Sequence, residues 1–134
     1  MSYLLDTNIL IYYFNGDFSV ELKKAITTII KHDFNVSVIS KMEFLGFTQF
    51  TVKEKQQAEI FISYANILTL VDKIVEETIQ IKQTKKIKLP DAIIAATALH
   101  HNMELITNNS KDFKGINLIV HEPIMLDGVA KPVQ

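Results

Sequence analysis

Short apolar runs alternate with stretches of helical periodicity along most of this chain. Apolar or alternating runs predict strands over residues 3–5, 36–39, 67–70, 104–106 and 117–120. Between them, apolar residues recur at helical spacing and predict helices over residues 8–14, 19–31, 53–64, 72–85 and 91–101. Strands that alternate with helices are typical of an α/β fold built around a mostly parallel sheet of four to five strands.

Local signals mark where several of these helices begin and end. Asn15-Gly16 is a turn signal that closes the first helix, and Ser19 is a suitable N-cap for the second. Ser40 is predicted to cap a further helix, with Glu43 three residues later at the spacing of a capping box. Phe44 and its apolar neighbours predict that this first turn, Glu43 included, is partly buried.

Composition predicts one compact domain over residues 1–134, with 48% hydrophobic residues available for a core. There is no cysteine, which excludes disulfides, zinc–thiolate sites and cysteine nucleophiles. The first five residues carry no Lys or Arg and are followed by Asp6, so we expect no signal peptide and no membrane span. The absence of cysteine suits a cytoplasmic protein, so a cytoplasmic location is expected. The segment after residue 123 lacks periodicity and is expected to be loosely held.

The net charge of the protein is −1, so the protein as a whole does not attract nucleic acid electrostatically. Every basic residue is lysine, so phosphate contacts cannot use the bidentate fork of arginine. A local cluster, Lys82, Lys85, Lys86 and Lys88, precedes Asp91. This cluster is either a solvated helix end or a patch that contacts RNA.

Four acidic residues stand where a parallel sheet presents the carboxyl ends of its strands: Asp6, Glu43, Asp91 and Asp112. Ligands of open α/β sheets bind at that edge. Carboxylates gathered there, without cysteine or a suitably spaced histidine pair, favour hard divalent cations such as Mg²⁺ or Mn²⁺. Metal-assisted cleavage of a phosphodiester is the function that this set predicts.

Each acid also has a purely structural interpretation. Asp6 could cap the following helix, and Glu43 could complete the capping box with Ser40. Asp91 could complement a helix dipole, and Asp112 could be an ordinary polar loop residue. For Asp91 the functional interpretation is favoured, because alanines at helical spacing (Ala95, Ala98) would bring its helix, and with it this acid, close to the sheet.

Four sequence blocks together resemble the PIN-domain family of metal-dependent ribonucleases, and especially its VapC-type toxins. The blocks are Leu4-Leu5-Asp6-Thr7-Asn8, the segment 40–44 around Glu43, the segment 89–98 that contains Asp91, and the segment 105–113 that ends with Asp112-Phe113. The resemblance implies a three-layer α/β/α fold. It implies that the four acids are catalytic metal ligands, supported by Thr7, Asn8 and Thr107. Asn108 stands where many relatives carry arginine, and the fourth acid varies in position within the family.

The resemblance also implies the function and the partners. It implies an endoribonuclease that uses one or two Mg²⁺ or Mn²⁺ ions, acts as the toxin of a toxin–antitoxin pair, forms a homodimer and is inhibited by a small cognate antitoxin. Lys85, Lys86 and Lys88 would lie near Asp91 and are candidates to hold RNA phosphate. His100 and His101 end the Asp91 helix, far from its catalytic end, and His32 and His121 are expected at the surface.

Two other functions stay open at this point. The chain could be a non-catalytic, dimerising protein-binding module, or a housekeeping RNA-processing nuclease outside any toxin–antitoxin pair. Other α/β enzymes with an acid at the sheet edge fit less well. A haloacid-dehalogenase-like phosphatase would need a second acid where Asn8 stands, and a receiver domain would need adjacent acids after the first strand.

Overall fold

A five-stranded sheet with the order β3-β2-β1-β4-β5 forms the centre of the molecule. The computed structural model describes residues 2–123. Every strand pairing in this part of the chain is parallel. The strands are short: β1 (Tyr3–Leu5), β2 (Asn35–Ser37), β3 (Asn66–Leu68), β4 (Glu104–Ile106) and β5 (Val120–His121). The order places β1 in the middle, so its carboxyl end is flanked by those of β2 and β4.

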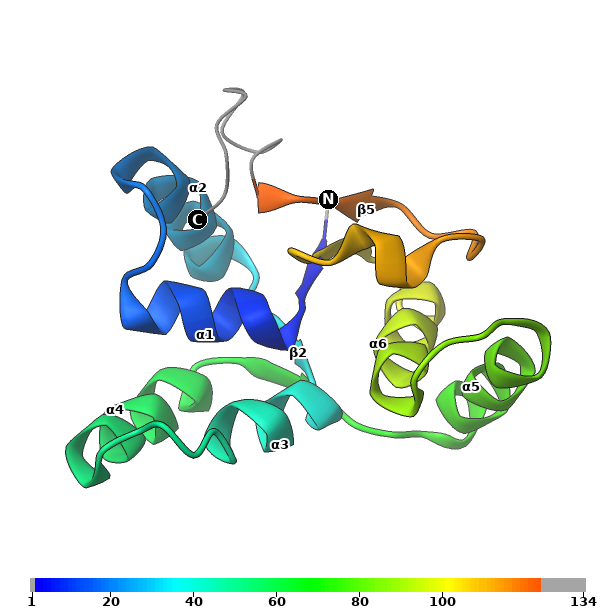
Figure 1. Cartoon of the computed structure of the whole chain (residues 1–134), viewed down its shortest axis with the longest axis horizontal. Helices are drawn as coiled ribbons and strands as arrows, with labels where there is room; N and C mark the ends of the chain where they lie inside the picture. Colours follow the sequence, from blue (N-terminus) through cyan, green and yellow to red (C-terminus); the bar gives the residue numbers. More distant parts are fainter. Residues whose placement is uncertain (1, 124–134) are drawn as a thin grey trace.

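Helices cover both faces of the sheet and make the three-layer α/β/α arrangement (Figure 1). One side carries α1 (Thr7–Asn15), α2 (Val20–His32), α3 (Val38–Leu45) and α4 (Val52–Ser63). The other side carries α5 (Asp72–Thr84) and α6 (Leu89–His100), and a short 3₁₀ helix, η1 (Ser110–Phe113), follows β4. The predicted α/β fold with a parallel sheet is confirmed. None of the helices in residues 2–123 combines the length and the apolar character that a membrane-spanning segment requires.

Alternating strand residues divide the interior into two cores. Leu4 of β1 and Leu105 of β4 pack with α5 and α6, whereas the next residues, Leu5 and Ile106, pack with α1 to α4. All four are at most 1% exposed. Successive side chains of a strand point to opposite faces, so both faces of these strands are buried, as a parallel sheet between helical layers requires.

A buried asparagine joins three strands at the end of the sheet opposite the acidic residues. Asn35 is 1% exposed, and its amide Nδ2 donates to the carbonyl of Tyr3 at 3.1 Å. Its Oδ1 accepts from Asn66 Nδ2 at 3.1 Å. A buried amide is costly unless it is hydrogen-bonded, so these contacts favour one alignment of β1, β2 and β3.

Several predicted helix boundaries are confirmed. Ser19 caps α2, where its side chain accepts from the N–H of Leu22. Gly16 ends α1 in the left-handed region, with a φ of 75° that glycine adopts without steric cost. A capping box does occur in this protein, but it lies at Thr51 and Glu54 at the start of α4.

The predicted boundary between the second strand and the next helix is wrong. Strand β2 ends at Ser37, and the side chain of Ser37, not of Ser40, caps α3 by accepting from the N–H of Ile39. Val38 and Ile39 are therefore helical, although β-branched residues favour strands. As a result, Ser40 lies buried inside α3, and Glu43 lies in its second turn with an exposed side chain.

Two smaller differences concern the ends of strands. Strand β5 covers only Val120–His121, since the residues before it form local bonds such as Leu118 N–H to the carbonyl of Ile116. Strand β3 ends at Leu68, two residues before the predicted end. The prediction of a loosely held segment after residue 123 lies outside the described residues.

Candidate active site

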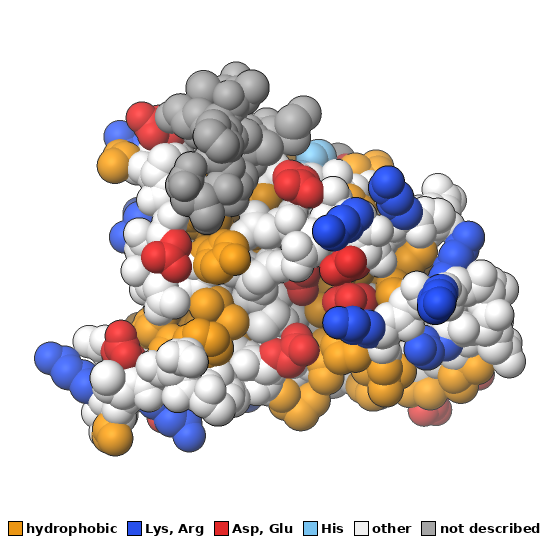
Figure 2. Space-filling view, viewed as in Figure 1, with side chains coloured by type: hydrophobic (Ala, Val, Ile, Leu, Met, Phe, Trp, Pro, Cys, Tyr) orange, Lys and Arg blue, Asp and Glu red, His pale blue; other side chains and the backbone are white. Residues whose placement is uncertain are grey.

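The four predicted acids come from four separate segments and gather at the carboxyl edge of the sheet. Asp6 directly follows β1, and Glu43 lies on α3, the helix that follows β2. Asp91 lies in the first turn of α6, and Asp112 lies on η1, after β4. Acidic side chains gather near the centre of the face seen in Figure 2, beside a group of lysines.

Asp6 is the most enclosed of the four acids, with 6% of its surface exposed. Its Oδ1 accepts from the N–H of Thr7 at 2.8 Å, so it does cap α1. Its Oδ2 accepts from the hydroxyl of Thr107, at the end of β4, at 2.6 Å. Burial raises the pKa of Asp6, the two hydrogen bonds oppose this rise, and the charges of Glu43 and Asp112 add to it. The structural and the functional interpretation of Asp6 are therefore compatible.

Thr7 connects Asp6 to Glu43 through a pair of hydroxyl groups. Its Oγ1 lies 2.6 Å from Glu43 Oε1 and 2.9 Å from the hydroxyl of Ser40, which is fully buried. A hydroxyl has one proton and a carboxylate only accepts, so Thr7 donates to Glu43 and accepts from Ser40. The two contacts fix α3 against the start of α1 and hold the Glu43 carboxylate at the sheet edge.

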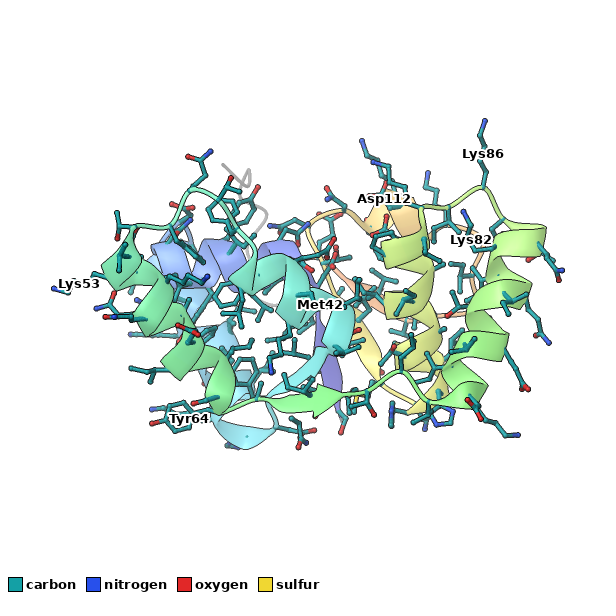
Figure 3. The ribbon with its side chains drawn as sticks, turned by 90° about the horizontal axis from the view of Figure 1, so that it is seen from below. Met42, Lys53, Tyr64, Lys82, Lys86 and Asp112 are labelled. Atoms are coloured by element: carbon teal, nitrogen blue, oxygen red, sulfur yellow. The ribbon has the colours of Figure 1, made fainter. Side chains whose placement is uncertain are left out.

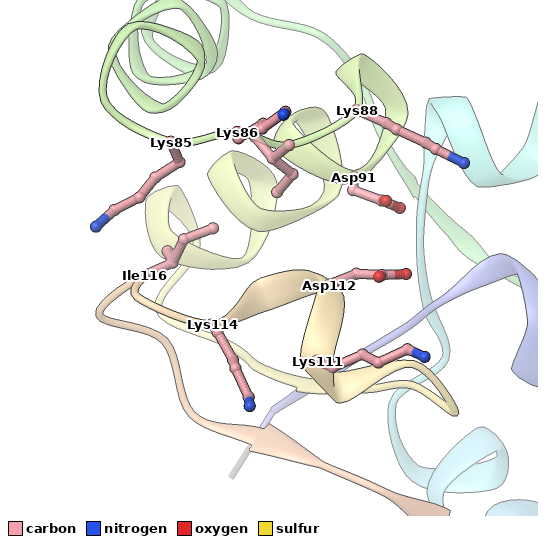
Figure 4. Close-up of a pocket in the computed structure, with 9 residues that line it drawn as sticks. Lys85, Lys86, Lys88, Asp91, Lys111, Asp112, Lys114 and Ile116 are labelled. Carbon is pink, nitrogen blue, oxygen red and sulfur yellow. The ribbon is translucent and has the colours of Figure 1, made fainter.

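Asp91 and Asp112 extend side by side in the same direction (Figure 4). Burial, followed by the charges of Asp6, Asp112 and Glu43, raises the pKa of Asp91 to about 6, and the nearby charge of Lys88 opposes this rise. Each of the other three acids therefore lies close enough to Asp91 to repel its negative charge. This shared electrostatic effect is consistent with one acidic site.

Asn8 and Asn108 lie beside this centre. The N–H of Asn108 approaches Asn8 Oδ1 at 3.5 Å, a long contact. Both polar side-chain atoms of Asn108 are buried and lack a hydrogen-bond partner among the described residues. Thr107, the neighbour of Asn108, also accepts from the N–H of Asn109 at 3.0 Å, which fixes the turn after β4. Of the predicted supporting residues, Thr7 and Thr107 therefore contact the acids directly, whereas Asn8 and Asn108 contact each other.

A pocket of about 350 Å³ opens beside Asp91 and Asp112, and five lysines line it (Figure 4). Lys85, Lys86 and Lys88 come from the loop between α5 and α6, and Lys111 and Lys114 come from η1 and the residue after it. Figure 3 shows Lys86 and Asp112 at the same edge of the molecule, and Lys53 and Tyr64 at its opposite side, on and just after α4. The predicted lysine cluster does lie at the edge that carries Asp91.

The donor set suits a hard cation in its chemistry, because it consists of carboxylate, hydroxyl and amide oxygens. In the described residues, no group of three or more His, Asp or Glu side chains is arranged so that it could hold a metal ion. An ion at these carboxylates would have to keep several of its own water molecules, as Mg²⁺ does. Asp6, Glu43, Asp91 and Asp112 are the residues that would hold it.

Sequence reasoning missed three contributors to the site. The role of Ser40 was hidden because its position was interpreted as a helix cap, whereas it is the hydroxyl partner of Thr7. Lys111 and Lys114 flank Asp112 in the sequence, and this spacing was the available signal. That they meet the α5–α6 lysines around one pocket follows only from the fold.

Comparison with known proteins places this architecture in a defined class. The profile of the PIN domain matches residues 3–117. A chain of a toxin–antitoxin complex from Klebsiella pneumoniae is 38% identical, with 91% of this chain and 98% of that one covered and a TM-score of 0.75. No protein among curated sequences matches.

Two further solved structures are similar. A chain of VapBC2 from Rickettsia felis, bound to a DNA fragment from its promoter, is 29% identical, covers 91% of this chain and 98% of its own, and has a TM-score of 0.74. A chain of VapBC-1 from nontypeable Haemophilus influenzae is 26% identical, covers 92% and 98%, and has a TM-score of 0.75. The chain therefore belongs to the PIN-domain family. The resemblance to VapC-type toxins is confirmed.

Proposed function

We propose that this protein is a metal-dependent endoribonuclease that acts as the toxin of a toxin–antitoxin pair. The main observation in support is the convergence of Asp6, Glu43, Asp91 and Asp112 from four segments into one site in which each of the others raises the pKa of Asp91. Repulsion of this kind is removed when a divalent cation binds, so the arrangement favours metal binding over an empty acidic centre. Similarity to chains of toxin–antitoxin complexes supports the toxin role.

The protein residues have separable tasks in this proposal. Asp6 is fixed by two hydrogen bonds, so its carboxylate is held in one orientation. Glu43 is held by Thr7, and Asp91 and Asp112 close the other side of the site. A bound Mg²⁺ or Mn²⁺, as one ion or two, would supply a water of lowered pKa and neutralise charge on the phosphate. Lys85, Lys86 and Lys88 would attract the RNA backbone to this edge.

Purified protein and a structured RNA test the proposal. We expect the protein to cleave RNA in the presence of Mg²⁺ or Mn²⁺ and not in the presence of a chelator. Asp6→Asn and Asp91→Asn should each lower the cleavage rate at least a hundredfold. Asp72→Asn is the matched control, because Asp72 also lies in the first turn of a helix but is exposed and outside the site. Equal activity in Asp6→Asn and the control would favour the non-catalytic binding module instead.

The toxin role needs a partner, and we propose a small cognate antitoxin that covers the acidic site. A short reading frame next to the gene should encode it, with a basic DNA-binding pattern. Co-expression should yield a complex that no longer cleaves RNA, in the cytoplasm where both would act. A gene without such a neighbour, combined with intact nuclease activity, would favour a housekeeping nuclease for RNA processing.

We also propose that the protein is a homodimer, and α5 offers a surface for it. Val71, just before α5, and Val75 and Ile79 follow one another at four-residue spacing and are 44%, 38% and 52% exposed. Such a spacing places them along one helix face, and exposed apolar stripes mark contact surfaces. Light scattering should give twice the chain mass for the wild type, and Val75→Lys with Ile79→Lys should give a monomer. A monomeric wild type would refute this part.

A further inference from the structure

The pocket beside the acids has the properties of an anion site. Its five lysines belong to two segments that lie far apart in the sequence, and its apolar lining is Ile87 and Ile116. The chain as a whole has a net charge of −1, so this concentration of positive charge is a local feature. Like charges that face one pocket repel each other unless an anion lies between them.

None of these five lysines forms an ion pair within the described part of the molecule, although the charge of Lys88 acts on Asp91 from a greater distance. The ion pair found there within 4.0 Å joins His121 to Glu104, at 2.6 Å. Asp91 and Asp112 line the same pocket, yet no lysine ammonium lies within that distance of their carboxylates. The lysine side chains are exposed, so all five charges are available to a ligand.

The loop that carries three of the lysines is fixed in place. Ile87 is buried in the core, and its carbonyl accepts from Lys82 Nζ at 2.7 Å. On the opposite wall, Gly115 has a φ of 80°, and a side-chain Cβ at this position would lie 3.1 Å from Lys85 Nζ. The glycine therefore lets the Lys85 ammonium approach the η1 segment, which brings the two walls of the pocket together.

The lysines differ in their direction relative to the acids. Lys88 and Lys111 extend in the same direction as the carboxylates of Asp91 and Asp112 and flank them, whereas Lys85 and Lys114 lie on the far side of the pocket (Figure 4). The pocket therefore extends from the acidic site in the direction away from the carboxylates of Asp91 and Asp112. A nucleic-acid strand cut at the acids must place its neighbouring phosphate on one side or the other.

We propose that this lysine pocket binds the phosphate next to the cleaved linkage of single-stranded RNA, with Lys85 and Lys114 as its main contacts. The inference rests on the proposed function. Lysine offers point charges without base recognition, so the contact fixes the direction of the strand and not its sequence. A carboxylate of another protein is a less favoured ligand for this pocket. RNA carries a phosphate at every nucleotide, so a strand bound at the acidic site places a phosphate near the pocket, whereas protein carboxylates have no such regular spacing.

The experiment measures binding of a labelled single-stranded RNA at a series of salt concentrations. Asp6→Asn is the background, so that the strand is not cut. Lys85→Gln with Lys114→Gln should lower the slope of log K against log salt by about 0.7, the value for one phosphate contact on a single strand. A single-stranded DNA should lose the same amount, because a phosphate contact does not involve the 2′-hydroxyl.

Lys24→Gln with Lys31→Gln is the matched control, since both lysines are exposed on α2 and the change in net charge is the same. An unchanged slope in the pocket variant, or an equal loss in the control, overturns the proposal. The proposal is also overturned if the binding of polyglutamate depends on Lys85 and Lys114 but the binding of RNA does not depend on these two lysines. If wild type cleaves RNA but the pocket variant keeps its slope, only the pocket assignment fails. If wild type does not cleave, the proposed function fails, and this inference fails with it.

Discussion

Replacing Asp91 by asparagine is expected to stabilise the metal-free protein at neutral pH, although the same change removes a proposed metal ligand. The negative charge of Asp91 is disfavoured by burial and by three neighbouring acids, which raise its pKa from the ordinary 3.8 to about 6. Asparagine has nearly the same shape but no charge, so it removes the repulsion. The stabilisation should therefore appear wherever wild-type Asp91 is ionised.

The pH dependence follows from proton binding. Between about pH 4 and pH 6 folded wild type holds a proton on Asp91 that the unfolded chain has released, so its stability falls as the pH rises through this window. One pKa unit corresponds to about 1.4 kcal/mol, which gives about 3 kcal/mol for a fully enclosed group. Because Asp91 is only half-buried and solvent screens its charge, we expect about 1 kcal/mol. That change corresponds to about 3–5 °C in melting temperature.

Thermal unfolding in the presence of a chelator, at pH 4 and pH 8, measures this effect. Asp91→Asn should melt several degrees above wild type at pH 8, and the difference should disappear at pH 4. Adding Mn²⁺ at pH 8 should raise the melting temperature of wild type and raise that of the variant less, since ligand binding to the folded state is stabilising.

Asp72→Asn controls for the loss of an acid from the first turn of a helix, which costs about 0.3–1 kcal/mol through the helix dipole. Asp72 is exposed on α5 and lies outside the acidic site. If the two variants change the melting temperature equally at both values of pH, the four carboxylates do not share one site and the reasoning is refuted.

Three further outcomes follow from contacts in the site and the core. Ser40→Ala removes the hydroxyl partner of Thr7 and should lower the free energy of unfolding by about 1 kcal/mol in urea titrations, while a smaller change than 0.3 kcal/mol would argue against the contact. Thr107→Val removes the donor to Asp6, so the pKa of Asp6 should rise and the pH–activity profile should move to higher pH, whereas Thr107→Ser should retain the wild-type profile. Leu105→Ala opens a cavity at a fully buried position and should cost about 2–5 kcal/mol of unfolding free energy, measured by calorimetry; full stability would contradict its place in the core.

The sheet and its acidic edge could be predicted from the same sequence pattern, an apolar run followed directly by a polar residue. An apolar run identifies a strand, and a polar residue directly after it, such as Asp6 or Thr107, marks the carboxyl end where parallel strands meet. Asp91 and Asp112 do not directly follow a strand; the start of a helix and the loop after a strand indicate them, and the PIN-type blocks support the four acids as one set. Asp91 lies on a helix and Asp112 on a 3₁₀ turn, so chain topology alone brings them to Asp6.

The details that the sequence did not reveal depend on competition between local interactions. Ser37 and Ser40 are both chemically able to cap α3, and β-branched Val38 and Ile39 between them favour a strand by propensity. The structure selects Ser37, which buries Ser40 beside Thr7. The lysine pocket is formed by residues 85–88 together with residues 111–116, and local sequence patterns do not show that these two segments meet.

The amide of Asn35 has a consequence at the far end of the sheet. Its hydrogen bonds to Tyr3 and Asn66 hold only in the observed pairing of the three strands. A displacement of β2 by one residue would turn each of its side chains to the opposite face and leave this group unpaired in a dry interior. Since α3 starts directly after β2, the same displacement would carry Glu43 out of reach of Thr7. An uncharged side chain at the opposite end of the sheet from Glu43 therefore helps to fix the position of Glu43 relative to Thr7 and Asp6.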